Sequence, residues 1–390
     1  MSTNKISRSH SSSGDAEIKR HREVRASDFK SFRFVVSALF LVALLIFSLT
    51  YQKPELIERG AVVEPERITE SRVTFLAVGD MMISRGVARS ITRANDPLVP
   101  FRKMDGIFRS TDFNFGNLEV PISGNNNVLG KGLVFNMHTR DIAGLKAYNF
   151  KVLNLANNHA LDQGVNGLRR TRQFLDEHGF THLGVGDDPE QAWQPKTITV
   201  NGVKIGFVGA SYASVNDGGV ARNDYVARIE DTDRLKTAIA RLRAEGADFI
   251  VATMHAGVEY TRRPHQPQID FARNAIDFGA DLVIGAHPHW AQIFETYKGK
   301  YIFYSLGNFI FDQEWSRDTK EGLTLKITLQ SRKSSAPKSG FPPQGTRVEQ
   351  IELIPIVIEN YSTPRPATET EAQQILKKIG APEKIIKPNE

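Results

Sequence analysis

The chain has 390 residues, 40% hydrophobic and 24% charged, and its formal net charge is +6. This length allows one large domain or two of medium size. Cysteine is absent from the sequence, which excludes disulfides and thiolate metal sites, so a metal ion would need imidazole, carboxylate or amide ligands. We find no basic stripe with aromatic platforms beyond the N-terminal segment, so nucleic-acid binding is not expected.

The N-terminal part of the chain predicts a membrane anchor. Residues 1–33 are polar and basic, and we predict a disordered cytoplasmic tail there. The uncharged stretch FVVSALFLVALLIFSLTY follows at residues 34–51. As a helix it would span roughly 27 Å, close to the ~30 Å apolar layer of a bilayer, so we predict one transmembrane helix. A cleaved signal peptide or a buried core helix are the alternatives. The preceding positive charge predicts a single-pass protein of the cell membrane, with its N-terminus cytoplasmic and its main domain extracytoplasmic.

The rest of the chain predicts one α/β domain. Residues 52–70 are charged, and we interpret them as a stalk. Across residues 71–362, short β-branched runs alternate with amphipathic helical patterns, which is typical of helices packed on a sheet. Residues 331–345 contain Pro and Gly and predict a flexible loop. We interpret residues 363–390 as a C-terminal tail with one short candidate helix.

Several predicted strands end in side chains that can bind metal. A divalent cation needs such groups from several loops that converge on one point, and α/β proteins build their sites at strand ends. Taken singly, an Asp here could be a turn or helix cap, and a His could be a satisfied core residue. Together they favour a site. They are Asp80; Asn117 and Glu119; Asn157, Asn158, His159 and Asp162; His255 and Glu259; and His287 and His289.

Six motifs in order resemble the bacterial capsule-synthesis CapA family, across residues 73–313 and on toward 358. The motifs are GD at Asp80, GNLE at Glu119, NNH-x-x-D-x-G at 157–164, H-x-G-x-E at 255–259, G-x-H-P-H at 285–289 and YSLGNFIFDQ at 304–313. The resemblance implies an association with poly-gamma-glutamate capsules. It also implies a fold similar to calcineurin-like metallophosphoesterases, in which two mixed sheets lie face to face with helices outside, as a four-layer αββα sandwich.

The resemblance also implies roles for single residues, with one or two divalent ions (Mn, Fe, Zn or Mg) as cofactor. Met82 stands where a His ligand is usual and Glu119 where an Asp is usual, so the first metal position is in doubt. We therefore favour the second, formed by Glu119, Asn158, His255 and His287. The implied metal ligands are Asp80, Glu119, Asn158, His255, His287 and His289. His159 would protonate a leaving group, and Asp162 would orient its ring or, alternatively, cap a helix. The implied substrate or supporting groups are Asn117, Asn157, Glu259, Arg262, Asn308 and Asp312.

Two functions follow as expectations. The first is a metal-dependent hydrolase that acts outside the membrane on a phosphoester or another anionic envelope substrate. The second is a non-catalytic component of a capsule assembly or export machine, with partner subunits, in which the metal site binds the polymer or stabilises the fold. A polyanion such as poly-gamma-glutamate suits a protein of positive net charge.

Overall fold

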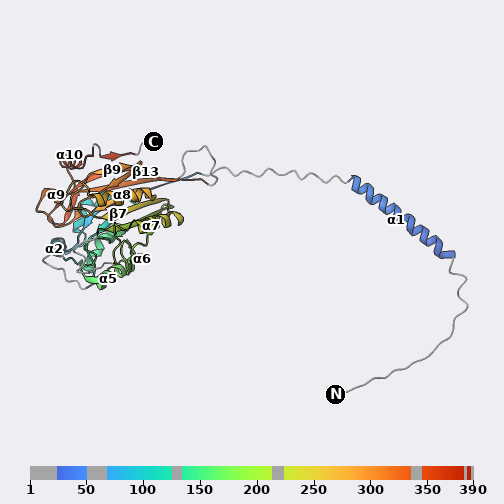
Figure 1. Cartoon of the computed structure of the whole chain (residues 1–390), viewed down its shortest axis with the longest axis horizontal. Helices are drawn as coiled ribbons and strands as arrows, with labels where there is room; N and C mark the ends of the chain where they lie inside the picture. Colours follow the sequence, from blue (N-terminus) through green and yellow to red (C-terminus); the bar gives the residue numbers. More distant parts are fainter. Residues whose placement is uncertain are drawn as a thin grey trace, which may run out of the picture. The chain divides into compact units, whose positions relative to one another are not determined.

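The computed structural model describes residues 24–50, 68–124, 134–212, 224–334, 345–381 and 384–387. Contacts divide the chain into two compact units, Met1–Pro65 and Glu66–Glu390. Figure 1 labels some of the elements of both units and colours the chain along its sequence. The first unit contains one described helix, and the second contains all the described strands, so each unit is described by itself.

The N-terminal unit contains helix α1, Val24–Thr50. It includes most of the apolar stretch that begins at Phe34, but it starts earlier, within the charged sequence that we had assigned to a disordered tail. Among the described residues, no helix combines the length and the apolar character that a membrane crossing requires. The structure therefore does not support the predicted transmembrane helix. Residues 1–23 of the predicted tail and residues 52–67 of the predicted stalk lie outside the described residues.

In the second unit, nine of the described strands form one mixed sheet. Strands β1 to β4 run parallel to one another, whereas β12 to β14 continue the sheet in antiparallel pairs. The order is β14 (Thr363–Pro366), β13 (Gly345–Glu359), β12 (Glu321–Ser334), β1 (Ile68–Met81), β2 (Phe113–Leu118), β3 (Phe150–Asn154) and β4 (Thr181–Leu183), with β11 (Asn308–Ile310) paired to β1 and β15 (Ile385–Ile386) to β13.

The other six described strands form a second mixed sheet. Its central strands β6, β7, β8 and β10 are parallel, and an antiparallel strand closes each edge. The order is β5 (Lys196–Val200), β6 (Val203–Ser211), β7 (Phe249–His255), β8 (Leu282–Ala286), β10 (Lys300–Phe303) and β9 (Phe294–Tyr297).

Three hydrophobic clusters of described residues join the sheets and helices into layers. Side chains alternate along β1: Phe75 lies in the cluster shared by the two sheets, and Leu76 in the cluster under the helices. The outer helices of the nine-stranded sheet are α2 (Arg85–Ala94), η1 (Val99–Met104), α3 (Asp105–Phe108), α4 (Ile142–Ala147) and α5 (Gly164–Glu177); those of the six-stranded sheet are α6 (Pro189–Ala192), α7 (Thr232–Ala244) and α8 (Gln266–Asp277). Two mixed sheets with helices outside are therefore confirmed.

The ends of the domain differ from the predicted boundaries. Strand β1 begins at Ile68, before residue 71. The segment interpreted as a C-terminal tail is part of the domain, because β14 and β15 pair with β13 and helix α10 (Glu369–Lys378) buries Ile375 and Leu376. The candidate helix in that segment is therefore present. The short elements η2 (Thr139–Asp141) and α9 (Arg317–Lys320) complete the fold. Residues 335–344 of the predicted loop lie outside the described residues.

Two glycines let backbone segments approach closely where strands end. A Cβ atom at Gly79 would overlap the carbonyl oxygen of Gly307, and a Cβ at Gly285 would overlap that of Tyr304. Gly79 directly precedes Asp80, and Gly285 stands two residues before His287. The close backbone contacts at these glycines therefore help to fix the backbone positions of two predicted ligands, Asp80 and His287.

We predict that Gly285→Ala lowers the free energy of unfolding by about 3 kcal/mol or more, because backbone must shift to admit the methyl group. Gly106→Ala is the matched control: no atom lies within 4 Å of its added Cβ, and the residue is in helix α3, so stability is expected to stay equal or rise. Chemical denaturation of both variants measures this. Equal stability of the two would contradict the close-contact argument.

Candidate metal centre

Strand register brings the predicted site residues together. Asp80 on β1 is paired with Asn117 on β2, and Asn117 is paired with Asn154 on β3. In the other sheet His255, at the end of β7, is paired with Ala286 at the end of β8, and His287 follows directly. Both sheets therefore supply groups to one centre, as expected from polar residues at the ends of parallel strands.

Asp80 is fully buried and its carboxylate is held from several sides. Asn117 Nδ2 donates a hydrogen bond to Oδ1 at 2.8 Å, and the backbone N–H of His287 donates to Oδ2 at 3.2 Å. Asn154 Nδ2 in turn donates to Asn117 Oδ1 at 2.9 Å, which fixes the Asn117 amide. His289 Nδ1 lies 3.6 Å from Asp80 Oδ2. Asn117 thus holds the Asp80 carboxylate in position.

Glu119 is also fully buried, but neither of its carboxylate oxygens has a hydrogen-bond partner among the described residues. Burial, together with the negative charge of Asp80, raises the pKa of Glu119 well above its usual value. The nearest cationic candidates are His159 Nε2 at 3.7 Å and His255 Nε2 at 3.9 Å from Oε1. A buried carboxylate without partners is strongly unfavourable, so this position calls for a positive charge.

The imidazoles of His255 and His287 lie beside the two carboxylates. His255 Nε2 is 2.8 Å from Asn158 Oδ1 and 3.1 Å from His287 Nδ1. Burial, and then the neighbouring imidazoles, hold the pKa of His255 and of His287 well below the usual value. Both rings are therefore neutral at physiological pH, which is the form that binds a metal ion.

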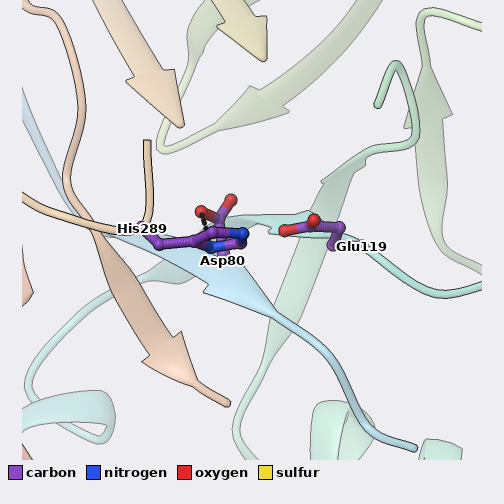
Figure 2. A group of neighbouring side chains, drawn as sticks. All are labelled: Asp80, Glu119 and His289. Carbon is purple, nitrogen blue, oxygen red and sulfur yellow. Dashed lines mark ion pairs between the residues drawn. The ribbon is translucent and has the colours of Figure 1, made fainter. Parts of the chain in front are cut away.

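The chemistry of these groups fits a divalent metal ion. Asp80, Glu119 and His289 each offer one ligand atom, and these atoms lie within 4.8 Å of one another. Figure 2 shows the three side chains directed toward one another. Two buried carboxylates, one of them without hydrogen-bond partners in the described structure, form a ligand set that suits a divalent cation. The sequence had placed this first position in doubt, yet the structure brings its ligands together.

The backbone of the His-Pro-His segment is unusual. His287 has φ of 102° and His289 has φ of 57°, in the region that side chains rarely adopt. Such conformations cost about 1–3 kcal/mol each and are found mostly at functional sites. His289 Nδ1 lies 2.9 Å from Asn308 Oδ1, so Asn308 supports this ring. The strained backbone supports the interpretation of this motif as a binding segment.

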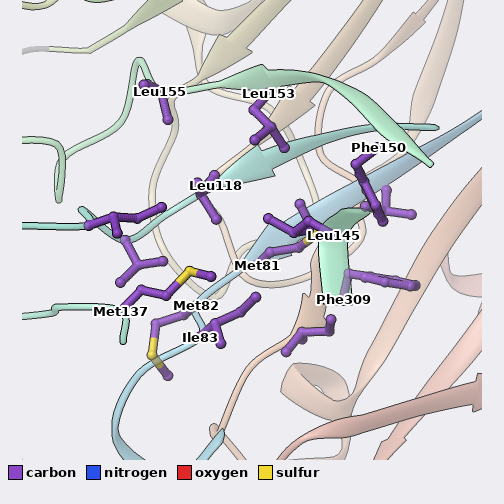
Figure 3. Packing of buried hydrophobic residues seen from close by; sticks show 14 of the residues in the cluster. Met81, Met82, Ile83, Leu118, Met137, Leu145, Phe150, Leu153, Leu155 and Phe309 are labelled. Carbon is purple, nitrogen blue, oxygen red and sulfur yellow. The ribbon is translucent and has the colours of Figure 1, made fainter. Parts of the chain in front are cut away.

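Met82, which stands where the resemblance would place a His, is part of the hydrophobic core. It is fully buried, and Figure 3 shows it packed in the apolar cluster with Met81, Ile83 and Met137. Its side chain is directed into the core, away from polar groups. At this position the chain therefore has a side chain that packs in the hydrophobic core and offers no imidazole ligand.

His159 and Asp162 form a hydrogen-bonded pair beside the centre. His159 Nδ1 lies 2.8 Å from Asp162 Oδ2, which also accepts the backbone N–H of Phe135 at 2.5 Å. Burial raises the pKa of Asp162. The alternative that Asp162 caps helix α5 is wrong, since the N-cap residue is Gln163. Asn157 accepts the backbone N–H of His159 at 3.1 Å and so positions the pair.

Three of the predicted substrate groups have other partners or lie at the surface. Asp312 is paired with Arg85 and accepts the N–H of Gly86 at 2.8 Å. Arg262 is paired with Asp318. Glu259 is exposed. The first two therefore serve as structural ion pairs, because their charges are already compensated within the domain.

Two aromatic residues at the centre were missed by sequence reasoning. The ring of Tyr212 lies 4.6 Å from that of His287, and the ring of Tyr260 lies 5.9 Å from that of His289. Burial raises the pKa of Tyr260 to about 12, so it is a neutral phenol. Tyr212 directly follows strand β6, the same strand-end position as the predicted ligands, and this signal could have identified it.

Solved structures offer only distant likenesses. The putative 5'-nucleotidase from Staphylococcus aureus is 16% identical, and the match covers 80% of this chain and 58% of that chain with a TM-score of 0.48. The NAD nucleotidase of Haemophilus influenzae is 13% identical, with 81% and 64% covered and a TM-score of 0.45. Likenesses of this size support no statement about fold or function.

Sequence relatives are closer. The Capsule biosynthesis protein CapA of Bacillus anthracis is 29% identical over 88% of this chain and 80% of its own length. The PGA biosynthesis protein CapA of Bacillus subtilis is 30% identical over 88% of this chain and 86% of its own length. The family described as Bacterial capsule synthesis protein PGA_cap matches residues 74–313, which include all the residues of the metal centre. The chain therefore belongs to the PGA_cap family of bacterial capsule synthesis proteins.

Proposed function

We propose that this protein is a metal-dependent hydrolase of capsule synthesis, acting on a phosphoester or another anionic substrate of the cell envelope. The observation that carries the proposal is the His159–Asp162 pair, whose free ring nitrogen lies 3.7 Å from Glu119 in the buried metal centre. A proton donor beside a metal site is the pairing that hydrolysis of an ester requires.

Asp80, Glu119 and His289 would hold the ion, with Asn158, His255 and His287 beside them. A divalent ion at this place supplies a Lewis acid that stabilises negative charge on an ester oxygen. The protein contributes the dry, fixed surroundings: His287 N–H and the Asn117 amide hold Asp80 in one orientation. Neutral His255 and His287 leave the charge of the two carboxylates available to the ion.

The His159 ring is oriented to move a proton at its Nε2 atom. Asp162 Oδ2 accepts from Nδ1, which fixes the tautomer and turns Nε2 toward Glu119. The Phe135 ring stacks on the His159 ring with centroids 4.0 Å apart, which restricts its rotation. A protonated Nε2 would donate to the leaving oxygen of a substrate held at the centre.

The substrate class is supported by charge and by the names of relatives. Two relatives are named for capsule biosynthesis and for PGA biosynthesis. A third, from Mycobacterium tuberculosis, is 28% identical over 62% of this chain and is named a probable polyglutamine synthesis accessory protein. A chain of net charge +6 attracts an anionic polymer. We extend the proposal to partner subunits of a capsule-synthesis complex.

We also propose that residues 34–51 hold the protein at the cell membrane, with the main domain outside. Support comes from the described apolar side chains of α1, which are exposed; Leu39 is 63% exposed and Leu49 78%. A helix with apolar side chains on every face is unfavourable in water, and lipid would cover it.

The localisation proposal predicts that the full-length protein sediments with membranes and is released by detergent but not by alkaline carbonate. A variant that lacks residues 24–50 should appear in the soluble fraction. Protease added to cells without an outer barrier should digest the main domain while an N-terminal tag stays protected. Carbonate release, or a protected main domain, would overturn this arrangement.

The metal centre predicts that Mn²⁺, Mg²⁺ or Zn²⁺ raises the melting temperature of the full-length protein. Ion at 100 times its dissociation constant adds about 2.7 kcal/mol of stability. Glu119→Gln should lose most of this gain, and should melt at a higher temperature than wild type without metal, because Gln avoids the cost of either ionising or protonating the buried Glu119. Calorimetry with and without ion, paired with metal content by mass spectrometry, checks both. An equal metal-induced gain in the variant would exclude Glu119 as a ligand.

The proton-donor role predicts that His159→Gln lowers kcat on aryl phosphate mono- or diesters by about 10²–10⁴-fold, with metal content retained. His178→Gln is the matched control, because His178 lies at the end of helix α5 and its side chain hydrogen-bonds only Phe174 O among the described residues. Wild-type protein that binds metal but hydrolyses no ester with any ion would refute the hydrolase and favour the binding role.

A further inference from the structure

Tyr260 lies between the buried metal centre and the surface of the domain. Its ring stacks beside that of His289, with centroids 5.9 Å apart, and the Trp315 ring meets it edge-on at 4.8 Å. His289 is 3% exposed, Tyr260 is partly buried and Trp315 is 62% exposed. The three rings therefore lead from the centre outward to solvent. A ligand that reaches the centre along them contacts Tyr260.

The backbone holds Tyr260 against the His-Pro-His segment. Its φ angle is 63°, in the left-handed region, which is costly for a bulky side chain. Its backbone N–H donates to Pro288 O at 2.9 Å, and Pro288 stands between His287 and His289, whose φ angles are also positive. Strain of this kind is found mostly at functional sites. The strained conformation of Tyr260 therefore belongs with that of the two histidines.

A chain of amides positions the Tyr260 hydroxyl. Gln313 Nε2 donates a hydrogen bond to the hydroxyl at 3.4 Å, and Gln313 Oε1 accepts one from Asn308 Nδ2 at 3.1 Å. Asn308 Oδ1 in turn lies 2.9 Å from His289 Nδ1. Because the hydroxyl accepts from Gln313, it keeps its own proton to donate elsewhere. The amides that hold the His289 ring therefore also orient this donor.

Carboxylates on two sides act on this hydroxyl. Burial, then the Glu259 carboxylate and more weakly that of Glu119, raise the pKa of Tyr260 to about 12. The charge of Glu119 thus reaches the phenol, so the hydroxyl lies within electrostatic range of the metal centre. Glu259 is exposed, so water can solvate its carboxylate when the hydroxyl turns toward a ligand. The phenol is therefore a neutral donor beside the site at physiological pH.

We propose that the Tyr260 hydroxyl donates a hydrogen bond to a negatively charged oxygen of a substrate held at the metal centre. The inference rests on the proposed function, since it adds a catalytic residue to the same site. The hydroxyl keeps its proton, so no bond to it forms or breaks, and it stabilises negative charge during cleavage. His159 and Tyr260 then have separate tasks. His159 protonates the leaving oxygen, whereas Tyr260 binds an oxygen that stays on the phosphoryl group.

The test uses the full-length protein in detergent, with Mn²⁺ present and inorganic phosphate as the probe in calorimetric titrations. Tyr260→Phe removes the hydroxyl and keeps the ring, so it should bind phosphate about tenfold more weakly, because a hydrogen bond to a charged group is lost. The rise in melting temperature with Mn²⁺ alone should equal that of wild type. The matched control is Tyr297→Phe on strand β9, whose hydroxyl donates to Asp277 Oδ2 at 3.3 Å in an exposed hydrogen bond, and it should bind phosphate as wild type does.

Turnover of an aryl phosphate gives a second readout. Tyr260→Phe should lower kcat by about 10²-fold, and Tyr297→Phe should keep the wild-type rate. Equal phosphate affinity in wild type and Tyr260→Phe, or no phosphate binding by wild type with Mn²⁺, would overturn the inference. A smaller Mn²⁺-induced rise in Tyr260→Phe would overturn it too, since the tyrosine would then act through the ion. Wild-type protein that binds phosphate through Tyr260 but cleaves no ester would refute the hydrolase and leave the hydrogen-bond donor in place.

Discussion

Two buried carboxylates, Asp80 and Glu119, are the constraint on which the rest of the domain depends. Neither is exposed to water, and their negative charges raise each other's free energy. Asp80 is satisfied by an amide and a backbone N–H, whereas Glu119 has no hydrogen-bond partner in the described structure. The imidazoles of His255 and His287, which lie beside these carboxylates, are neutral. The proposed ion would offset the negative charge that the two carboxylates bring together.

The two sheets share the task of bringing these groups together. Asp80, Asn117 and Glu119 come from the nine-stranded sheet, and His255 and His287 from the six-stranded one. Neither sheet alone holds a complete set. The arrangement of the site therefore depends on how the two sheets pack through the hydrophobic cluster between them. The parallel register of β1 to β3 sets the positions of the residues from the nine-stranded sheet. The close backbone contacts at Gly79 and Gly285 fix the strand ends from which Asp80 and His287 follow.

The features that the sequence could indicate are those whose geometry is local. Alternating apolar runs showed the strands, and parallel strands bring their ends together by rule. His159 and Asp162 are three residues apart, so their pairing needed no knowledge of the fold. The roles of Asp312 and Arg262 could not be predicted, because their partners are 227 and 56 residues away. The joining of residues 363–390 to the sheet depends on pairing with β13, which leaves no local pattern.

The positive φ angles of His287 and His289 have an evolutionary consequence. Glycine at either position would relax the backbone, so replacement there releases conformational strain while it removes an imidazole from the site. Selection for a stable fold alone therefore acts against these two histidines, whereas selection for the proposed ion would keep them. A lineage that no longer needed the ion would lose it readily and keep a sound domain. Few substitutions thus separate this domain from a relative that acts purely as a scaffold. A glycine at the position of His287 or His289 would identify such a relative.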